Sequence, residues 1–287
     1  MNLNSGPMYD LHDVPLLGDT VLVVSLAGWV DAAQSSAEAT KQLLRDPDKR
    51  LMARFNTDRL LDQRARRPIL KLVDGVTQSL TWPALEMQLL STEADRSVLL
   101  LHGPEPDHEW KSFAQSVVEL AQQFNVSLVV GLGAFPAAVP HTRPTRLSCT
   151  ASTPALAERL SFVTSTLEVP AGAQAVIEVA AAAAGIPAVG IWAQVPHYLA
   201  AMSFPPASEA LLEGLSDLTE VDFSLGSLPE KSLAARSRLD ELITQNPEHV
   251  TMLETLEQAY DDLHDDRGQL PSGDELAAEL ERFLRDQ

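Results

Sequence analysis

Cysteine is nearly absent from this sequence. The chain of 287 residues contains only Cys149, so no disulfide can form within it. Such cysteine use is consistent with a reducing compartment, and we therefore expect a cytoplasmic protein. Cys149 lies in the apolar segment 147–151, where we expect a buried and unreactive thiol.

Positive charge is also scarce. Lysine and arginine number 21 against 40 aspartate and glutamate residues, which gives a formal net charge of −19. A surface of that sign repels phosphate backbones, so the sequence argues against nucleic-acid binding. Anionic membranes are disfavoured for the same electrostatic reason.

Long hydrophobic runs are missing as well. The longest weakly polar stretch, 171–195, consists mostly of alanine and is interrupted by Gly185 and Pro187. Alanine gains little free energy in lipid, and the two breakers end a continuous helix, so we expect no membrane span here. The segment 1–13 carries acids and no basic region, so no secretory signal is predicted there.

The composition does provide for a core. Apolar residues make up 45% of the chain, enough for one large domain. About half of the 40 acidic residues follow Ala207, and the alternation of strands and helices ends near Leu225. We therefore predict an α/β domain over 1–226 and an acidic helical extension over 227–287.

Before residue 226, runs rich in Val, Leu and Ile alternate with segments of helical periodicity. Such runs are typical of strands covered on both faces, and the alternation indicates βαβ units. The predicted strands lie at 20–27, 97–101, 126–132, 146–151 and 188–195, and the predicted helices at about 31–44, 109–124 and 171–184.

Turn and cap residues add three further elements. Asp74-Gly75 suits a type I′ turn, so we expect a hairpin between 68–73 and 76–82. This hairpin would add antiparallel pairs to the parallel crossovers, which predicts a mixed sheet. In the extension, Asn246-Pro247 is a helix start signal, and 272–275 has the residues of a capping box for a second helix.

Four of the apolar runs end in short polar clusters. If these runs are parallel strands of one sheet, the clusters meet at its carboxyl edge, where open α/β sheets bind ligands. The candidate ligand-binding or interface residues, together with Arg67, are Trp29, Asp31, His102, Glu105, Asp107, His141, Thr142, Arg143 and His197.

Several of these residues also have a structural interpretation. Asp31 and Asp107 can cap the helices that follow them, and His197 can be a structural histidine. The histidines lack the close spacing of metal ligands, so no metal is predicted. No complete dinucleotide, phosphate-loop or nucleophile-elbow motif is present, and no cofactor is predicted either.

The most specific short motif is Pro140-His141-Thr142-Arg143-Pro144. Its prolines favour an extended backbone that presents an imidazole, a hydroxyl and a guanidinium from one strip. The Arg143 guanidinium can offer a bidentate fork to a phosphate or carboxylate, or it can pair with Asp31 or Glu105.

Taken together, four motifs resemble those of a known family. They are Gly28-Trp29-x-Asp31-Ala32-Ala33, Asp62-x-Arg64-x-x-Arg67-Pro68, Gly103-x-Glu105-Pro106-x-x-x-Trp110-x-x-Phe113 and Pro140-His141-Thr142-Arg143-Pro144. With them, residues 15–225 resemble the actinobacterial branch of the proteasome assembly chaperone family, which is named after the second eukaryotic assembly chaperone.

The resemblance implies a fold and partners. It implies a three-layer α/β/α body with a mixed sheet, similar to nucleoside phosphorylases and peptidyl-hydrolase-like folds, and a homo-oligomer, with a trimer among the expected states. Eukaryotic and archaeal members are linked to building or binding the proteasome. Some archaeal relatives end in a hydrophobic-tyrosine-any tail, whereas residues 283–287 lack that tyrosine, so docking through such a tail is not expected.

Two functions of different classes stay open at this point. The first is a non-catalytic, oligomeric protein with a protein partner and an assembly role, in which the acidic extension is a docking or oligomerisation element. The second is an enzyme, a hydrolase, phosphorylase-like transferase or ligase, that acts on a small anionic ligand. There His141 and Arg143 would hold the anion, Trp29 would stack, and Glu105 or Asp31 would move protons. A third alternative makes the four clusters a subunit interface.

Overall fold

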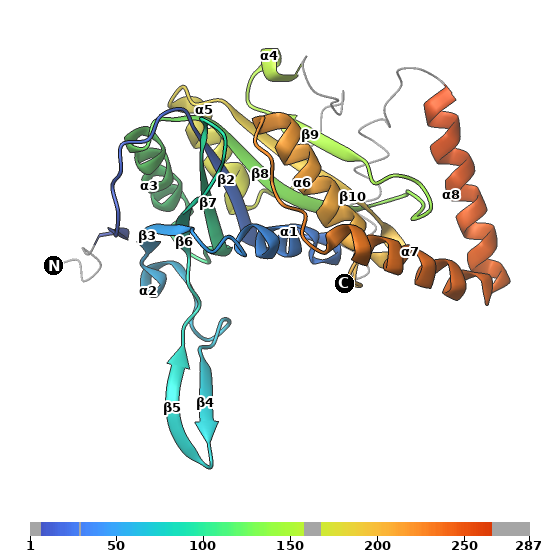
Figure 1. Ribbon diagram of the computed structural model, residues 1–287, viewed down its shortest axis with the longest axis horizontal. Helices are drawn as coiled ribbons and strands as arrows, with labels where there is room; N and C mark the ends of the chain where they lie inside the picture. Colours follow the sequence, from blue (N-terminus) through green and yellow to red (C-terminus); the bar gives the residue numbers. More distant parts are fainter. Residues whose placement is uncertain (1–6, 29, 158–167, 266–287) are drawn as a thin grey trace. The chain divides into compact units, whose positions relative to one another are not determined.

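The computed structural model describes residues 7–28, 30–157 and 168–265 (Figure 1). Trp29 and the helix predicted after residue 272 lie outside the described residues.

Within the described residues, the main sheet has eight strands in the order β1-β3-β6-β7-β2-β8-β10-β9. They are β1 (Tyr9–Leu11), β2 (Thr20–Ala27), β3 (Arg50–Phe55), β6 (Glu86–Leu90), β7 (Ser97–Pro104), β8 (Val126–Ala137), β9 (Leu147–Ala151) and β10 (Ala188–Pro196). β2 and β7 pair in parallel, whereas β1 with β3, β3 with β6, β6 with β7 and β9 with β10 pair antiparallel. The predicted fold class is confirmed: an α/β protein with a mixed sheet flanked by helices and followed by C-terminal helices.

The predicted hairpin forms, but it does not join the main sheet. β4 (Ile69–Val73) and β5 (Val76–Thr81) pair with each other as a separate two-stranded sheet. Asp74 and Gly75 have φ values of 50° and 79°, the positive values that a type I′ turn needs. The prediction that this hairpin supplies the antiparallel pairs of the mixed sheet is therefore wrong. Those pairs come from other strands.

The helices are α1 (Ser35–Leu43), α2 (Thr57–Leu60), α3 (Trp110–Gln123), α4 (Pro154–Ala157), α5 (Ala173–Ala183), α6 (Pro205–Thr219), α7 (Leu228–Thr244) and α8 (Pro247–Asp265), with short 3-10 turns at Ala32–Gln34 (η1) and His197–Leu199 (η2). The helix predicted from about residue 31 thus begins at Ser35, after η1. α6 was not predicted, because its Pro205-Pro206 start reads as a loop although proline is favoured in the first helical turn. β1, β3 and β6 were not predicted either, since they are short or interrupted by polar residues.

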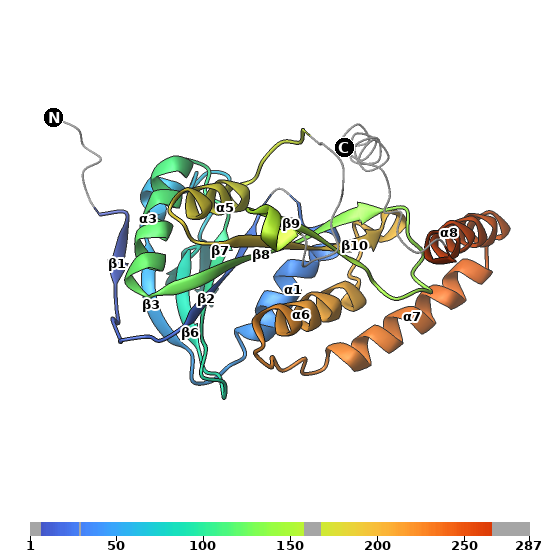
Figure 2. The same cartoon turned by 90° about the horizontal axis from the view of Figure 1, so that it is seen from above.

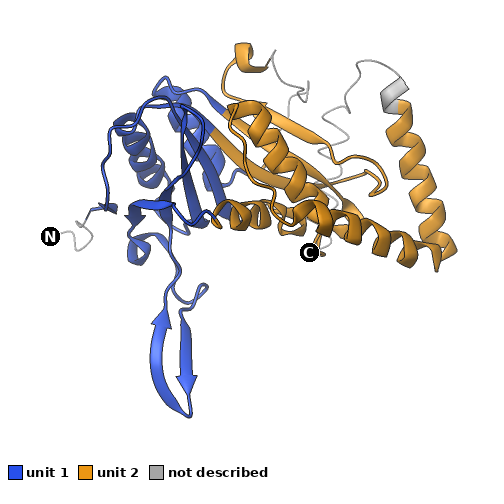
Figure 3. Cartoon of the chain, viewed as in Figure 1, with its two compact units in different colours: residues 1–29, 46–129, 171–188 blue, residues 30–45, 130–170, 189–287 orange. Residues whose placement is uncertain are grey.

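Two compact units that interleave in sequence make up the chain (Figure 3). Unit 1 comprises residues 1–29, 46–129 and 171–188, and unit 2 comprises 30–45, 130–170 and 189–287. The division into domains at residue 226 stays a prediction.

Unit 1 contains a continuous hydrophobic core. Leu22 and Leu99 of β2 and β7 are fully buried in it, together with Phe113 of α3 and Ile177 of α5. α3 and α5 lie side by side (Figure 2). The apolar stripe predicted for α3 forms its buried face, which is why a helix of this periodicity covers the strands of this unit.

In unit 2, α6 packs between α1 and α7, and α8 packs on α7. Leu211 and Leu215 of α6 are fully buried, and the Ser208 hydroxyl donates to the Ser35 carbonyl at 2.9 Å. The predicted start of α8 is confirmed, because the Asn246 side chain accepts a hydrogen bond from the Glu248 N–H at 3.0 Å and caps the helix.

Candidate functional site

The candidate residues are divided between the two units. Arg67, His102, Glu105 and Asp107 belong to unit 1, and Asp31, His141, Thr142, Arg143 and His197 belong to unit 2. Trp29 lies outside the described residues. The convergence of all four clusters on one edge therefore stays a prediction, and the contacts within each unit can be followed separately.

In unit 2, His141 is completely buried and sits between Tyr198 and Asp240. The His141 backbone N–H donates to the Tyr198 hydroxyl at 3.0 Å, and the Tyr198 oxygen lies 2.8 Å from the imidazole Nδ1. The imidazole Nε2 lies 3.1 Å from Oδ1 of Asp240, a residue of α7. All hydrogen-bonding groups of this side chain are thus used within the fold.

These contacts determine the protonation state of His141. Burial lowers the pKa of His141, and the Asp240 and Glu257 carboxylates only partly offset this, so the imidazole is neutral at pH 7. A neutral ring that faces the Asp240 carboxylate through Nε2 must carry its proton there and accept at Nδ1 from the Tyr198 hydroxyl. Burial likewise raises the pKa of Tyr198, to about 12, which keeps this hydroxyl available as a donor.

Thr142 and Arg143 both contact α8. The Thr142 hydroxyl donates to Glu257, and the Arg143 guanidinium donates from Nε and Nη2 to Asp261 at 2.8 and 2.5 Å. A third contact joins Arg143 Nη1 to Glu257 at 3.2 Å. Hydrogen bonding to Asp261 raises the pKa of Arg143 above its already high value. Arg143 therefore uses its bidentate fork on an acid of this chain, and that acid is neither Asp31 nor Glu105 as the sequence had suggested.

The next residues of the same segment also meet α8. The Tyr260 hydroxyl donates to the Pro144 carbonyl at 3.0 Å, and the Arg146 guanidinium lies 5.0 Å from the centre of the Tyr260 ring. Residues 141–146, which we call the strap, are thus bound along their length by α7 and α8.

Asp31, also in unit 2, accepts hydrogen bonds from the first turn of α1. Its two carboxylate oxygens receive the Ser36 and Ala37 N–H groups at 2.7 and 3.0 Å. Burial raises the pKa of Asp31, and these N–H groups act in the opposite direction. The predicted capping role is present, although the side chain reaches past η1 to do it.

In unit 1, the Glu105 side chain accepts a hydrogen bond at the start of a helix that is distant in sequence. Its Oε1 accepts from the Ala173 N–H, the first residue of α5, at 2.6 Å. Gly28 makes room for this side chain, because a Cβ at Gly28 would lie 2.3 Å from Glu105 Oε2 and 2.6 Å from Glu105 Cβ. The Gly28 and Glu105 motifs, 77 positions apart, are therefore explained by one close packing contact.

The other candidates of unit 1 make different contacts. Asp107 does not cap α3; it pairs with Arg66 and accepts from the Asp62 N–H at 2.7 Å, and so holds the segment before the hairpin. Arg67 is exposed. His102 is partly buried, its Nε2 has no hydrogen-bond partner among the described residues, and burial lowers its pKa.

His197, back in unit 2, is exposed at the start of η2. Its ring packs edge-on against Tyr198, with ring centroids 5.4 Å apart. The residues that sequence reasoning missed are the acids that bind the strap, Asp240, Glu257 and Asp261. The available signal was the spacing of Glu257 and Asp261, which puts two carboxylates on one face of a helix.

Within residues 7–28, 30–157 and 168–265, no three His, Cys, Asp or Glu side chains gather as metal ligands would. Over the same residues, no helix combines the length and apolarity needed to cross a membrane.

Comparison with known proteins identifies the family. The sequence model of the PAC2 family matches residues 25–243. The chain belongs to the PAC2 family. This confirms the resemblance found in the sequence, and the match includes the strap, α6 and nearly all of α7. Among curated proteins, no match is found.

Solved structures agree with this PAC2 assignment. A protein of unknown function from Corynebacterium glutamicum is 31% identical with a TM-score of 0.83, and the match covers 90% of this chain and 99% of that one. A proteasome-assembly chaperone homologue from Mycobacterium tuberculosis is 33% identical with a TM-score of 0.75, covering 81% and 99%. Both organisms are actinobacteria, as expected for this branch of the family.

An archaeal structure shares the fold alone. The proteasome activator PbaB of Pyrococcus furiosus is 12% identical with a TM-score of 0.64, and the match covers 82% of this chain and 97% of that one.

Proposed function

We propose that this chain is a non-catalytic, homo-oligomeric PAC2 protein that binds other proteins and assists their assembly. The observation that carries the proposal is the β4–β5 hairpin. Every residue of its two strands is exposed, although most of the large side chains are apolar. Ile69 is 72% exposed, Leu72 57% and Val76 59%.

A covering protein would stabilise such a hairpin. A two-stranded hairpin alone is marginally stable in water. Side chains alternate between the two faces of a strand, so Ile69 and Val73 lie on one face and Leu70 and Leu72 on the other. Because both faces carry apolar groups, contact along one face would leave the other exposed. Insertion of the hairpin between surfaces of a partner would bury both faces.

A second copy of this chain is the partner that we propose for the hairpin. The segment 69–81 carries only two charged residues, Lys71 and Asp74. Interfaces of permanent homo-oligomers are more apolar and poorer in charge than transient ones. In Figure 1 the hairpin extends away from the strands of its own unit, so a neighbouring copy can reach both of its faces.

The strap supports a binding role over an enzyme that acts on an anion. His141 and Arg143, the residues expected to hold such a ligand, already bind Asp240 and Asp261. A phosphate or carboxylate would have to displace a carboxylate of the same chain from Arg143. The same internal contacts argue against the third alternative at the strap, because His141 and Arg143 are not free to bind another subunit.

Proteasome subunits are the assembly partner that we propose. The support is membership of the PAC2 family together with the name of the Mycobacterium relative, a proteasome-assembly chaperone homologue. The acidic net charge of −19 would favour basic surfaces on that partner.

Native mass spectrometry of the full chain tests the oligomer. We expect the wild type to be an oligomer and the double variant Leu72→Ser/Val76→Ser to be a monomer. Val179→Ser is the matched control, because Val179 on α5 is equally apolar and 71% exposed. An unchanged mass for the hairpin variant would remove the hairpin from the interface.

Co-expression with the proteasome α and β subunits of the source organism tests the partner. We expect the chain to co-purify with incomplete assemblies and to be absent from the mature particle. Failure to bind subunits or assembly intermediates, with the oligomer intact, would refute the partner while leaving the oligomer standing. A rise in melting temperature with phosphate that is lost in Arg143→Ala would instead favour the enzyme.

A further inference from the structure

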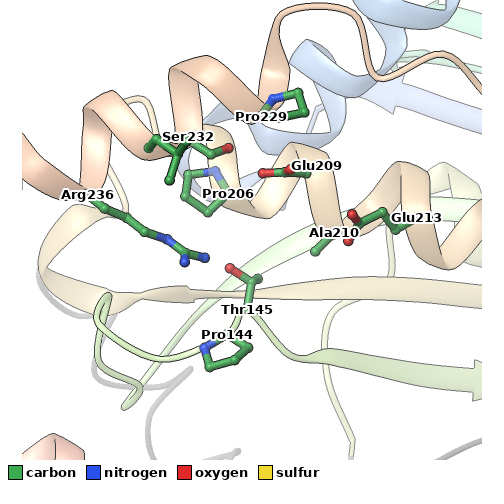
Figure 4. Close-up of a pocket in the computed structure, with 10 residues that line it drawn as sticks. Pro144, Thr145, Pro206, Glu209, Ala210, Glu213, Pro229, Ser232 and Arg236 are labelled. Atoms are coloured by element: carbon green, nitrogen blue, oxygen red, sulfur yellow. The ribbon is translucent and has the colours of Figure 1, made fainter.

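A second feature of unit 2 is a cavity of about 360 Å³ between α6, α7 and residues 144–145 (Figure 4). Its volume is in the range of small-molecule sites. Glu209 and Glu213 line it from α6, and Ser232 and Arg236 line it from α7. None of these four residues takes part in the contacts that hold the strap.

One side of the cavity carries polar groups without partners. Ser232 is only 3% exposed, yet its hydroxyl has no hydrogen-bond partner among the described residues. The same holds for the buried Thr145 hydroxyl and the buried Arg236 Nε. Buried polar atoms are nearly always hydrogen-bonded because an unmade bond costs about 1–3 kcal/mol. Three such atoms around one cavity form a candidate polar subsite.

These groups can converge on one oxyanion. Ser232 and Arg236 are four residues apart on α7 and therefore lie on the same helix face. Figure 4 shows the Arg236 guanidinium and the Thr145 hydroxyl pointing toward one another. A guanidinium N–H and two hydroxyls form a donor set suited to a carboxylate.

The α6 side has the opposite character. Glu209 and Glu213 are also four residues apart, and neither pairs with a lysine or arginine among the described residues. Burial raises the pKa of Glu213, and the neighbouring Glu209 and Asp217 carboxylates add to this, as expected for uncompensated negative charge. A bound cationic group would relieve that repulsion.

We propose that this cavity binds a free α-amino acid with an apolar side chain. Its carboxylate accepts from Arg236, Ser232 and Thr145, and its ammonium donates to Glu209 and Glu213. The apolar part of the ligand packs against Pro206 and the other proline and aliphatic side chains of the lining. A simple anion would leave the two glutamates unpaired, and a simple cation would leave the three donors unsatisfied. This site is independent of the proposed assembly role.

Thermal shift with the twenty amino acids, followed by calorimetric titration of the full chain, tests the site. We expect at least one apolar amino acid to raise the melting temperature. Its amide, which lacks the carboxylate, and its N-acetyl form, which lacks the ammonium, should bind at least tenfold more weakly. No shift with any amino acid at 10 mM, on the order of the weakest affinity of interest, or equal binding of the N-acetyl form, would overturn the proposal.

Matched substitutions on α7 test whether the ligand binds in this cavity. Ser232→Ala and Arg236→Gln should each weaken binding at least fivefold. Ser237→Ala and Arg238→Gln change the same residue types at exposed positions of the same helix and should leave the affinity unchanged. Equal losses in both pairs would overturn the assignment. If a cavity variant does not fold, the comparison of amide and N-acetyl forms on the wild type still decides.

Discussion

The imidazole of His141 meets the carboxylate of Asp240 at 3.1 Å, although 99 positions separate the two residues. This contact joins the proline-flanked motif to α7, a helix that begins where the α/β pattern of the sequence ends. The motif that the sequence indicates as a ligand site is therefore a junction between elements of the fold, and it is buried at His141.

Replacing His141 with alanine should destabilise the protein by about 2–4 kcal/mol. The change empties a fully buried site and leaves the Tyr198 hydroxyl without its ring partner. Equilibrium unfolding in urea measures the difference. His197→Ala is the control, because His197 is exposed, and it should cost less than about 0.5 kcal/mol. Equal effects of the two changes would contradict the assigned role of His141.

Replacing Arg143 with alanine should release α8 without changing the oligomer. Arg143 supplies the charged contacts to Glu257 and Asp261, so their loss should speed amide hydrogen exchange in α8 about fivefold or more. Hydrogen-exchange mass spectrometry measures the rates, and Arg238→Ala on the exposed side of α7 is the control. Dissociation of the oligomer by Arg143→Ala would instead place the strap in the subunit interface.

Replacing Gly28 with alanine should cost about 1–3 kcal/mol. The added Cβ would lie 2.6 Å from the Glu105 Cβ, which is fixed to the backbone and cannot rotate away. Displacement of Glu105 would also remove its hydrogen bond to the first turn of α5. Thermal unfolding measures the loss. Gly18→Ala is the matched control, since a Cβ there meets nothing within 4 Å, and a comparable loss in that variant would refute the packing argument.

Glu178 of α5 should make the stability depend on pH near neutrality. Burial raises the pKa of Glu178 to about 7, above the ordinary value of 4.5. The folded state therefore holds the proton more tightly than the unfolded state, and this contribution is full below pH 4.5 and lost as the pH rises through 7. Glu178→Gln removes the ionisable group. The gain in unfolding free energy of this variant over the wild type should therefore be about 1–2 kcal/mol larger at pH 8 than at pH 5.

Urea unfolding of the wild type and Glu178→Gln at both pH values measures this difference. Glu230→Gln, at an exposed position of α7, is the control. A Glu178→Gln effect that is the same at pH 5 and pH 8 would show that the carboxyl is not held neutral by the fold.

The local elements of this protein were largely predictable because they depend on neighbouring residues. The strand over 20–27 has the predicted limits, the Asp74-Gly75 turn has the required φ values, and Asn246 caps α8. Each depends on apolar periodicity, on turn geometry or on a cap, all of which act over a few residues. The family motifs, read as a pattern, were also sufficient to indicate the PAC2 family.

The partners of the candidate side chains could not be predicted from neighbouring residues. The sequence suggested Asp31 or Glu105 as the partner of Arg143. In the structure, Asp31 binds the start of α1 and Glu105 binds the start of α5, whereas Arg143 binds α8. Ion pairs require opposite charges within a few ångströms, and nothing in the spacing of residues separated by 118 positions specifies that distance. The sequence by itself thus determined which segments become strands and helices and which family they form. Only the tertiary structure decided that the histidine and arginine of the strap are bound internally, because burial and pairing depend on how distant segments pack.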